Sequence, residues 1–105
     1  MSQVQTNNKD PFKNRIYTEF EQNLYRILNI SLDEYRGIFE QQNDDPFEEF
    51  ETVYANDGAE KMRIAMNWAI VNLSVIYQER ELGRKMTGPE LKVHDEGLGL
   101  ELGLS

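Results

Sequence analysis

The amino-acid sequence predicts an all-α protein, a small four-helix bundle around one long, mostly apolar helix at about residues 59–82. Three observations support this prediction. Apolar side chains recur at three- and four-residue spacing, capping residues precede each apolar run, and no β-hairpin signal precedes the C-terminal tail. We expect a disordered N-terminal leader at 1–9, a helical domain at 10–86, and an extended tail rich in Leu and Gly at 87–105.

The first helix is predicted to begin at Asp10-Pro11 and to run to about Asn29. The Asp10 carboxylate can accept hydrogen bonds from the free N–H groups of the first turn, and proline is tolerated at the first helical position. The apolar residues that repeat with the helical period are Phe12, Ile16, Tyr17, Phe20, Leu24, Ile27 and Leu28.

Two shorter helices follow, each with its own start signal. Ser31 and Glu34 have the spacing of a capping box, which predicts a helix that begins near Leu32 and ends in the polar run 41–45. Asp45-Pro46 then repeats the first start signal. The side chains expected to face the core are Tyr35, Ile38 and Phe39 in the second helix, and Phe47, Phe50, Val53 and Tyr54 in the third.

The fourth helix has almost no polar side. Asp57 and Glu60 form a further capping-box pattern at its start, and Gly83 marks its end. Gly88-Pro89 is expected to end any helix that continues beyond Gly83. The few polar residues of its middle share one narrow sector on a helical projection: Arg63, Asn67, Ser74 and Gln78. A helix that is apolar on most of its circumference is buried on most sides. It therefore forms either the central pillar of the bundle or the shared core of an oligomer.

We expect a homodimer, because a large exposed apolar patch is unusual on a soluble monomer. Self-association is predicted through one face of the long helix, made by Ile64, Trp68, Val71 and Val75. Asn72 lies within the apolar arc, where an unpaired amide is costly. It either pairs across the subunit contact and fixes the register or bonds to a neighbouring backbone group.

The tail alternates leucine with glycine or glutamate, and a period of two is the period of a strand. An extended tail would place four leucines on one face: Leu98, Leu100, Leu102 and Leu104. Burying four leucines yields roughly 6–12 kcal/mol, which nearly cancels a backbone entropy cost of about 1–2 kcal/mol per ordered residue. The tail is therefore predicted to dock on a partner that supplies backbone hydrogen bonds, or else to fold back over the bundle or fray. In this segment alone, the pattern resembles the LxLxL repression peptide of plant transcriptional repressors.

Composition and charge limit the classes of function that this protein can have. The 105 residues include no cysteine and carry a net charge of −8, with ten acidic residues against one basic residue between 31 and 60. Direct nucleic-acid binding is disfavoured, because phosphate neutralisation needs clustered Lys and Arg. Residues 1–9 contain no secretory signal. The best candidate for a membrane span, 62–77, is too short and carries Arg63, Asn67 and Asn72. A soluble, cytoplasmic protein is expected.

Side chains able to support catalysis are few. An acidic surface is predicted at Asp44, Asp45, Glu48, Glu49 and Glu51. It lacks the histidine partners and the second copy of a helical carboxylate site, so a solvated surface is the simpler interpretation. His94, beside Asp95 and Glu96, could act as a general base. No serine is placed as an obvious nucleophile, however, and an exposed histidine is the favoured interpretation. We expect no cofactor and no bound metal.

The predicted function is a non-catalytic protein–protein interaction module that docks through its tail. An adaptor, an assembly factor or a small subunit of a larger complex would fit this description. Two alternatives stay open: a small acidic inhibitor of a nucleic-acid-binding enzyme that acts through residues 44–51, and a metal-dependent helical enzyme.

Overall fold

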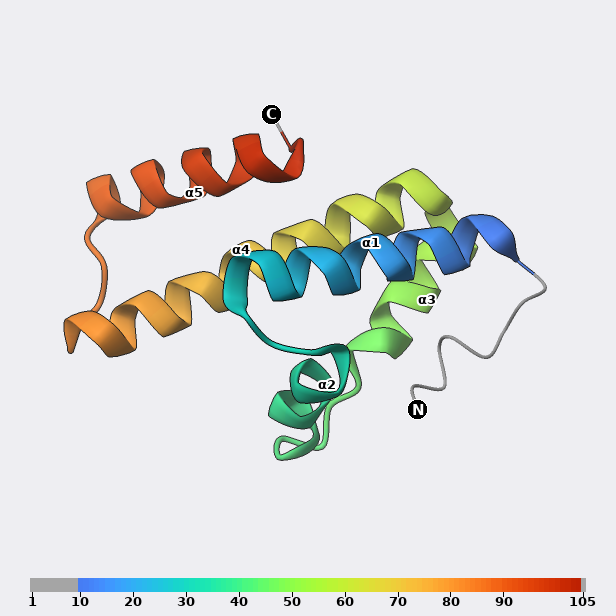
Figure 1. The fold of residues 1–105 in the computed structure, drawn as a ribbon, viewed down its shortest axis with the longest axis horizontal. Helices are drawn as coiled ribbons and strands as arrows, with labels where there is room; N and C mark the ends of the chain where they lie inside the picture. The colour runs from blue at the N-terminus through green and yellow to red at the C-terminus, as the bar shows by residue number, and fades with distance from the viewer. Residues whose placement is uncertain (1–9, 105) are drawn as a thin grey trace. The chain divides into compact units, whose positions relative to one another are not determined.

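The computed structural model describes residues 10–104, and all regular structure in that range is α-helical (Figure 1). The helices are α1 (Pro11–Leu28), α2 (Leu32–Glu40), α3 (Pro46–Asp57), α4 (Ala59–Leu82) and α5 (Gly88–Leu102). The all-α prediction is confirmed, although residues 10–104 contain five helices where four were expected. The predicted leader at 1–9 lies outside the described residues. No helix in the described range is both long and apolar enough to span a membrane.

The chain divides into two compact units, and the boundary falls inside α4 between Met66 and Asn67. The first unit contains α1, α2, α3 and the start of α4, and the second contains the rest of α4 and α5. The finer expectation, a bundle arranged around the long helix, stays a prediction.

The helix starts in the first unit follow the predicted caps. The Lys13 N–H donates to Asp10 Oδ1 over 3.1 Å, and the Phe47 N–H donates to Asp45 Oδ1 over 3.0 Å. Ser31 and Glu34 form both hydrogen bonds of a capping box. These bonds satisfy N–H groups that have no partner within the helix, which is why short polar side chains mark helix starts so reliably.

The predicted capping box at Asp57 and Glu60 is wrong. Asp57 is the last residue of α3, and Gly58 alone separates α3 from α4. Gly58 has φ 95° and ψ 178°, its N–H donates to the Tyr54 carbonyl, and its own carbonyl accepts from the Met62 N–H. One glycine therefore ends α3 and begins α4, because only glycine adopts this backbone conformation without strain.

An aromatic cluster holds the three short helices together. Phe20 of α1 contacts Tyr35 of α2 edge-on, with ring centroids 5.2 Å apart, and lies 5.6 Å from Phe50 of α3. Phe47 joins α3 to Tyr35 at 6.0 Å. The buried side chains of this unit are Ile16, Tyr17, Phe20, Leu24, Ile30, Leu32, Tyr35, Pro46, Phe47, Phe50, Met62 and Met66. Most of the predicted apolar stripe of α1 is therefore confirmed, but Phe12, in the first turn, is 66% exposed.

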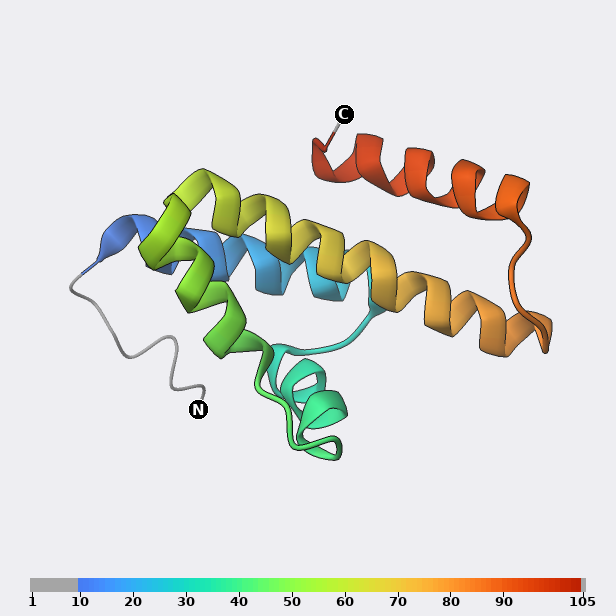
Figure 2. The same ribbon diagram turned by 180° about the vertical axis from the view of Figure 1, so that it is seen from behind.

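In the second unit, α5 runs antiparallel to the second half of α4, as both ribbon views show (Figures 1 and 2). The extended tail predicted for this segment is wrong, because residues 88–102 are helical. Thr87 and Glu90 form a capping box at its start, with Pro89 in the first turn, so Gly88-Pro89 begins a helix where the sequence predicted an end. Arg84 also binds both carboxylate oxygens of Glu90, at 2.8 and 2.9 Å.

Two residues of the polar sector of α4 are buried, whereas Gln78 of the same sector is exposed. Asn67 and Ser74 are 4% and 6% exposed, and both contact α5. The Asn67 Nδ2 donates to the Leu102 carbonyl over 3.4 Å, and Ser74 contacts His94. Asn72, predicted within the buried arc, is instead exposed. Buried polar groups need partners, and here α5 supplies them.

Candidate functional site

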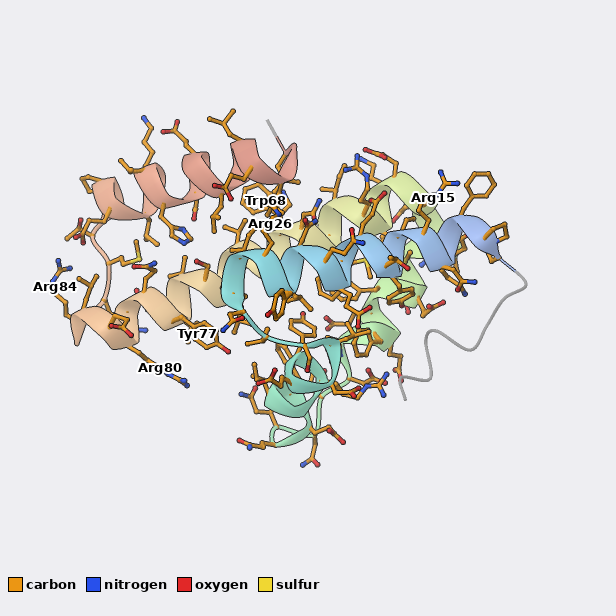
Figure 3. All side chains as sticks on the ribbon, in the orientation of Figure 1. Arg15, Arg26, Trp68, Tyr77, Arg80 and Arg84 are labelled. Atoms are coloured by element: carbon orange, nitrogen blue, oxygen red, sulfur yellow. The ribbon has the colours of Figure 1, made fainter. Side chains whose placement is uncertain are left out.

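An open groove lies where the end of α5 meets α4. It has a volume of about 440 Å³ and is lined by Trp68 of α4 and by Asp95, Glu96, Gly99, Leu100 and Leu104. The Trp68 indole lies beside the C-terminal part of α5 (Figure 3). Trp68 is 41% exposed and Leu100 is 70% exposed, so the apolar walls of the groove face solvent.

The way α5 ends shapes the floor of this groove. Gly103 has φ 73°, and the chain reverses there so that the Leu104 N–H donates to the Gly99 carbonyl over 2.7 Å. The Gly103 N–H donates to the Leu100 carbonyl, which completes a Schellman motif. Leu104 is thereby folded back toward Gly99: a Cβ added at Gly99 would lie 3.8 Å from the Leu104 Cβ. The missing side chain at Gly99 leaves room above this turn.

One edge of the groove is acidic. Asp95 contacts His94, with 2.9 Å between Asp95 Oδ1 and His94 Nδ1. Glu96 is exposed and forms no ion pair within residues 10–104. Neither Asp95 nor Glu96 is paired with a Lys or Arg side chain within residues 10–104, so this edge of the groove keeps its negative charge.

Ser74, His94 and Asp95 form a hydrogen-bonded chain across the two helices. Ser74 Oγ lies 2.8 Å from His94 Nε2, and the other ring nitrogen faces Asp95. With a neutral imidazole, His94 Nδ1 donates to Asp95 and Nε2 accepts from the Ser74 hydroxyl. His94 has only 10% of its side chain exposed, so the prediction of an exposed histidine is wrong. Local sequence patterns do not reveal this pairing, because the two partners lie 20 residues apart on different helices.

Ser74, His94 and Asp95 follow the order of a nucleophile, a base and an orienting carboxylate, but the surroundings of these three residues favour a structural role. Ser74 is buried in the middle of α4, where backbone N–H groups are already bonded within the helix and cannot stabilise an oxyanion. Ser74 and His94 also lie outside the lining of the groove. The hydrogen bonds among Ser74, His94 and Asp95 therefore fix the position of α5 on α4, and the position of α5 places the groove residues.

The four predicted docking leucines do not share a face. Leu98 and Leu102 are one helical turn apart, the first partly buried and the second 6% exposed. Leu100 lies on the opposite side of α5, and Leu104 follows the helix. Two of the four, Leu100 and Leu104, line the groove.

Of the residues predicted for self-association, only Trp68 exposes a large part of its side chain. Val71 is 1% exposed, and Ile64 and Val75 are partly buried. A contact with a second subunit would reach Trp68 first, and would not reach Val71 without a change in the structure.

The predicted acidic surface separates into two groups. Asp44, Asp45, Glu48 and Glu49 are exposed, and Asp45 also caps α3. Glu51 is half-buried and accepts hydrogen bonds from Lys13 Nζ at 2.9 Å and from the Tyr17 hydroxyl at 2.8 Å. Within the described residues, no three His, Asp or Glu side chains gather closely enough to hold a metal ion.

Comparisons of the chain with protein-family models, with curated proteins and with solved structures give no match in any of the three.

Proposed function

We propose that this chain is a non-catalytic protein–protein interaction module, acting as an adaptor, an assembly factor or a small subunit of a larger complex. One observation carries the proposal: Trp68 and Leu100 expose apolar surface on the same groove. Tryptophan is among the residues that contribute most to binding energy at protein interfaces. Exposed apolar surface gathered in a concave site is typical of interaction sites. The proposal includes the cytoplasmic location expected from the sequence.

The tail leucines keep a place in this proposal, with divided roles. Leu100 and Leu104 would contact the partner, since they line the groove. Leu102 would act indirectly, since its burial and the hydrogen bond from Asn67 to its carbonyl hold α5 in position.

A pair of variants tests this proposal. Leu100 and Val93 lie on α5 with nearly equal exposure, 70% and 71%, but only Leu100 lines the groove. Affinity capture from the native source, read by mass spectrometry, would compare the wild type with Leu100→Asp and Val93→Asp. We expect a partner that is lost with Leu100→Asp and retained with Val93→Asp. A partner retained by both variants would move the interaction away from the groove.

Self-association is a second form of the same proposal, supported by the exposure of Trp68. Light scattering at high micromolar concentration distinguishes a dimer from the monomer mass of 12.3 kDa. A Trp68→Ala variant should shift a dimer toward that mass. The monomer mass for the wild type would remove the homodimer from the proposal.

The alternative of an acidic inhibitor is supported by the exposed carboxylates of Asp44, Glu48 and Glu49. Inhibition through these charges should weaken steeply as the salt concentration rises, because the Debye length falls from about 10 Å at 0.1 M to about 3 Å at 1 M. The charges of Glu48 and Glu49 lie outside the groove. A Glu48→Lys, Glu49→Lys double variant should therefore lose an inhibited enzyme and retain a partner of the groove, which separates the two.

A further inference from the structure

The groove combines two chemical features that together describe its partner. Its walls are apolar, formed by Trp68, Leu100 and Leu104, and its edge carries the carboxylates of Asp95 and Glu96. A concave apolar site selects a bulky apolar side chain. Carboxylates at its rim favour a cation beside that side chain, and the electron-rich face of an indole attracts Lys or Arg as well.

Charge argues against two other occupants. A second copy of this chain would bring another net charge of −8 and, on the same face of α5, another excess of acidic residues. Nucleic acid would place phosphates against Asp95 and Glu96, whereas phosphate binding needs clustered Lys and Arg. Both contacts set like charges against each other, which costs free energy and slows association.

The backbone of the partner is constrained too. The groove is built from helices, and no strand edge is present in residues 10–104. An extended peptide would find no ladder of N–H and C=O groups to pair with its own backbone. A helix satisfies its own backbone hydrogen bonds and can present an apolar side chain with basic residues one turn away.

We infer that the groove binds a basic amphipathic helix of a partner protein, with one bulky apolar side chain against Trp68 and a Lys or Arg facing Asp95 and Glu96. This inference rests on the proposed function and names the class of partner. The Ser74–His94–Asp95 chain contributes by holding the carboxylate of Asp95 at the rim.

Synthetic peptides test the chemistry directly. Trp68 is the only tryptophan in the chain, so its fluorescence reports on the groove when the peptide contains no tryptophan. The probe is an amphipathic peptide of about 18 residues, above the length at which isolated helices become stable, with Leu on one face and Lys beside it. Its counterpart has Glu in place of each Lys. We expect saturable binding and a blue shift of the Trp68 emission with the basic peptide, and neither effect with the acidic one.

Two glycines of α5 offer a matched pair of variants. A Cβ at Gly99 would occupy the floor of the groove without a steric clash, whereas Gly97 is exposed, with nothing within 4 Å of an added Cβ. Both Gly→Ala changes favour the helix, so neither should unfold α5. We expect Gly99→Ala to weaken peptide binding about tenfold, the lower end of what one methylene changes in an apolar pocket. Gly97→Ala should leave the affinity unchanged.

A second pair of variants tests the charge at the rim of the groove. Glu96→Lys should weaken binding of the basic peptide severalfold and create binding of the acidic one. Glu81→Lys changes the net charge equally at an exposed position of α4 outside the groove, and should do neither.

Four results would overturn the inference: equal binding of both peptides, no binding of the basic peptide at millimolar concentration, equal effects of Gly97→Ala and Gly99→Ala, or a dimer that shields Trp68 without peptide. The interaction module itself would survive these results if Leu100→Asp still loses the native partner. The two proposals can therefore fail separately.

Discussion

The bond between Tyr17 and Glu51 gives the most direct test of the packing in the first unit. The Tyr17 hydroxyl, on a side chain that is 1% exposed, donates to Glu51 Oε2 over 2.8 Å. Burial, and then the hydrogen bond to this carboxylate, raises the pKa of Tyr17 above its ordinary value of 10, so the hydroxyl stays protonated and donates at neutral pH. The Glu51 side chain is 39% exposed and also binds Lys13.

This asymmetry in burial predicts unequal costs for the two ends of the bond. Glu51→Ala leaves a buried hydroxyl without an acceptor, and should reduce the free energy of unfolding by about 2–3 kcal/mol. Tyr17→Phe leaves a carboxylate that keeps Lys13 and is reached by water, and should cost only about 1 kcal/mol. Urea denaturation followed by the helical circular dichroism signal measures both values.

The double variant gives the decisive result. Once Tyr17→Phe has removed the hydroxyl, Glu51→Ala no longer leaves an unpaired buried group. In this background, the loss of unfolding free energy caused by Glu51→Ala should be smaller than in the wild type by at least about 1 kcal/mol. If the two costs add within about 0.3–0.5 kcal/mol, as they do for independent sites, the hydrogen bond does not contribute as described and the reasoning fails.

Three further predictions concern helix ends and α5. Ser31→Ala removes the capping box of α2 and should cost about 1 kcal/mol in urea denaturation. Gly97→Ala should stabilise the protein by about 1 kcal/mol, seen as a rise of roughly 4–8 °C in Tm, because residue 97 lies inside a helix. The hydrogen bonds from Arg84 lower the pKa of Glu90 from its ordinary 4.5 to about 2. Because this pKa is lower in the folded than in the unfolded protein, ionised Glu90 stabilises the fold at pH values above 4.5, and this stabilisation is lost as the pH falls from 4.5 toward 2. Trp68 fluorescence would follow the loss of α5, and Glu90→Gln should remove this pH dependence.

Controls for these three predictions lie on the same helices. Asp33→Ala, at an exposed position of α2 where Asp33 accepts no capping bond, should cost less than Ser31→Ala. For α5, Gly97→Ala without any gain in stability would contradict a helix at this position. An acid transition that persists unchanged in Glu90→Gln would assign it to another carboxylate.

Helix starts were predictable from the sequence because a cap is a local interaction. Asp10, Ser31 and Asp45 each bond to an N–H group no more than three residues away, so short-range spacing is sufficient to find them. The Thr87–Glu90 capping box is equally local. Its signal is obscured because Pro89 is typical of a helix end as well as of a first turn, and because the period-two leucines that follow are typical of a strand.

Which neighbour covers a face could not be predicted in the same way. The pattern correctly grouped Asn67 and Ser74 in one sector of α4, but their exposure depends on α5, whose contacts come from residues 20 or more positions away. The groove shows the same limit. Trp68, Leu100 and Leu104 were named from the sequence, whereas the contribution of Gly99 depends on the chain reversal that follows it.

The junction at Gly58 has a consequence for mutational tolerance. Nothing lies within 4 Å of a Cβ added there, so a map of tolerated substitutions drawn from contacts would score position 58 as free to vary. Its φ of 95° with ψ of 178° excludes that freedom, since residues with a side chain adopt this conformation only at a cost of about 1–3 kcal/mol. In a saturation library, nearly every substitution at position 58 should therefore be selected against, although the new side chain would meet no neighbour within 4 Å of its Cβ. Backbone conformation alone restricts this site.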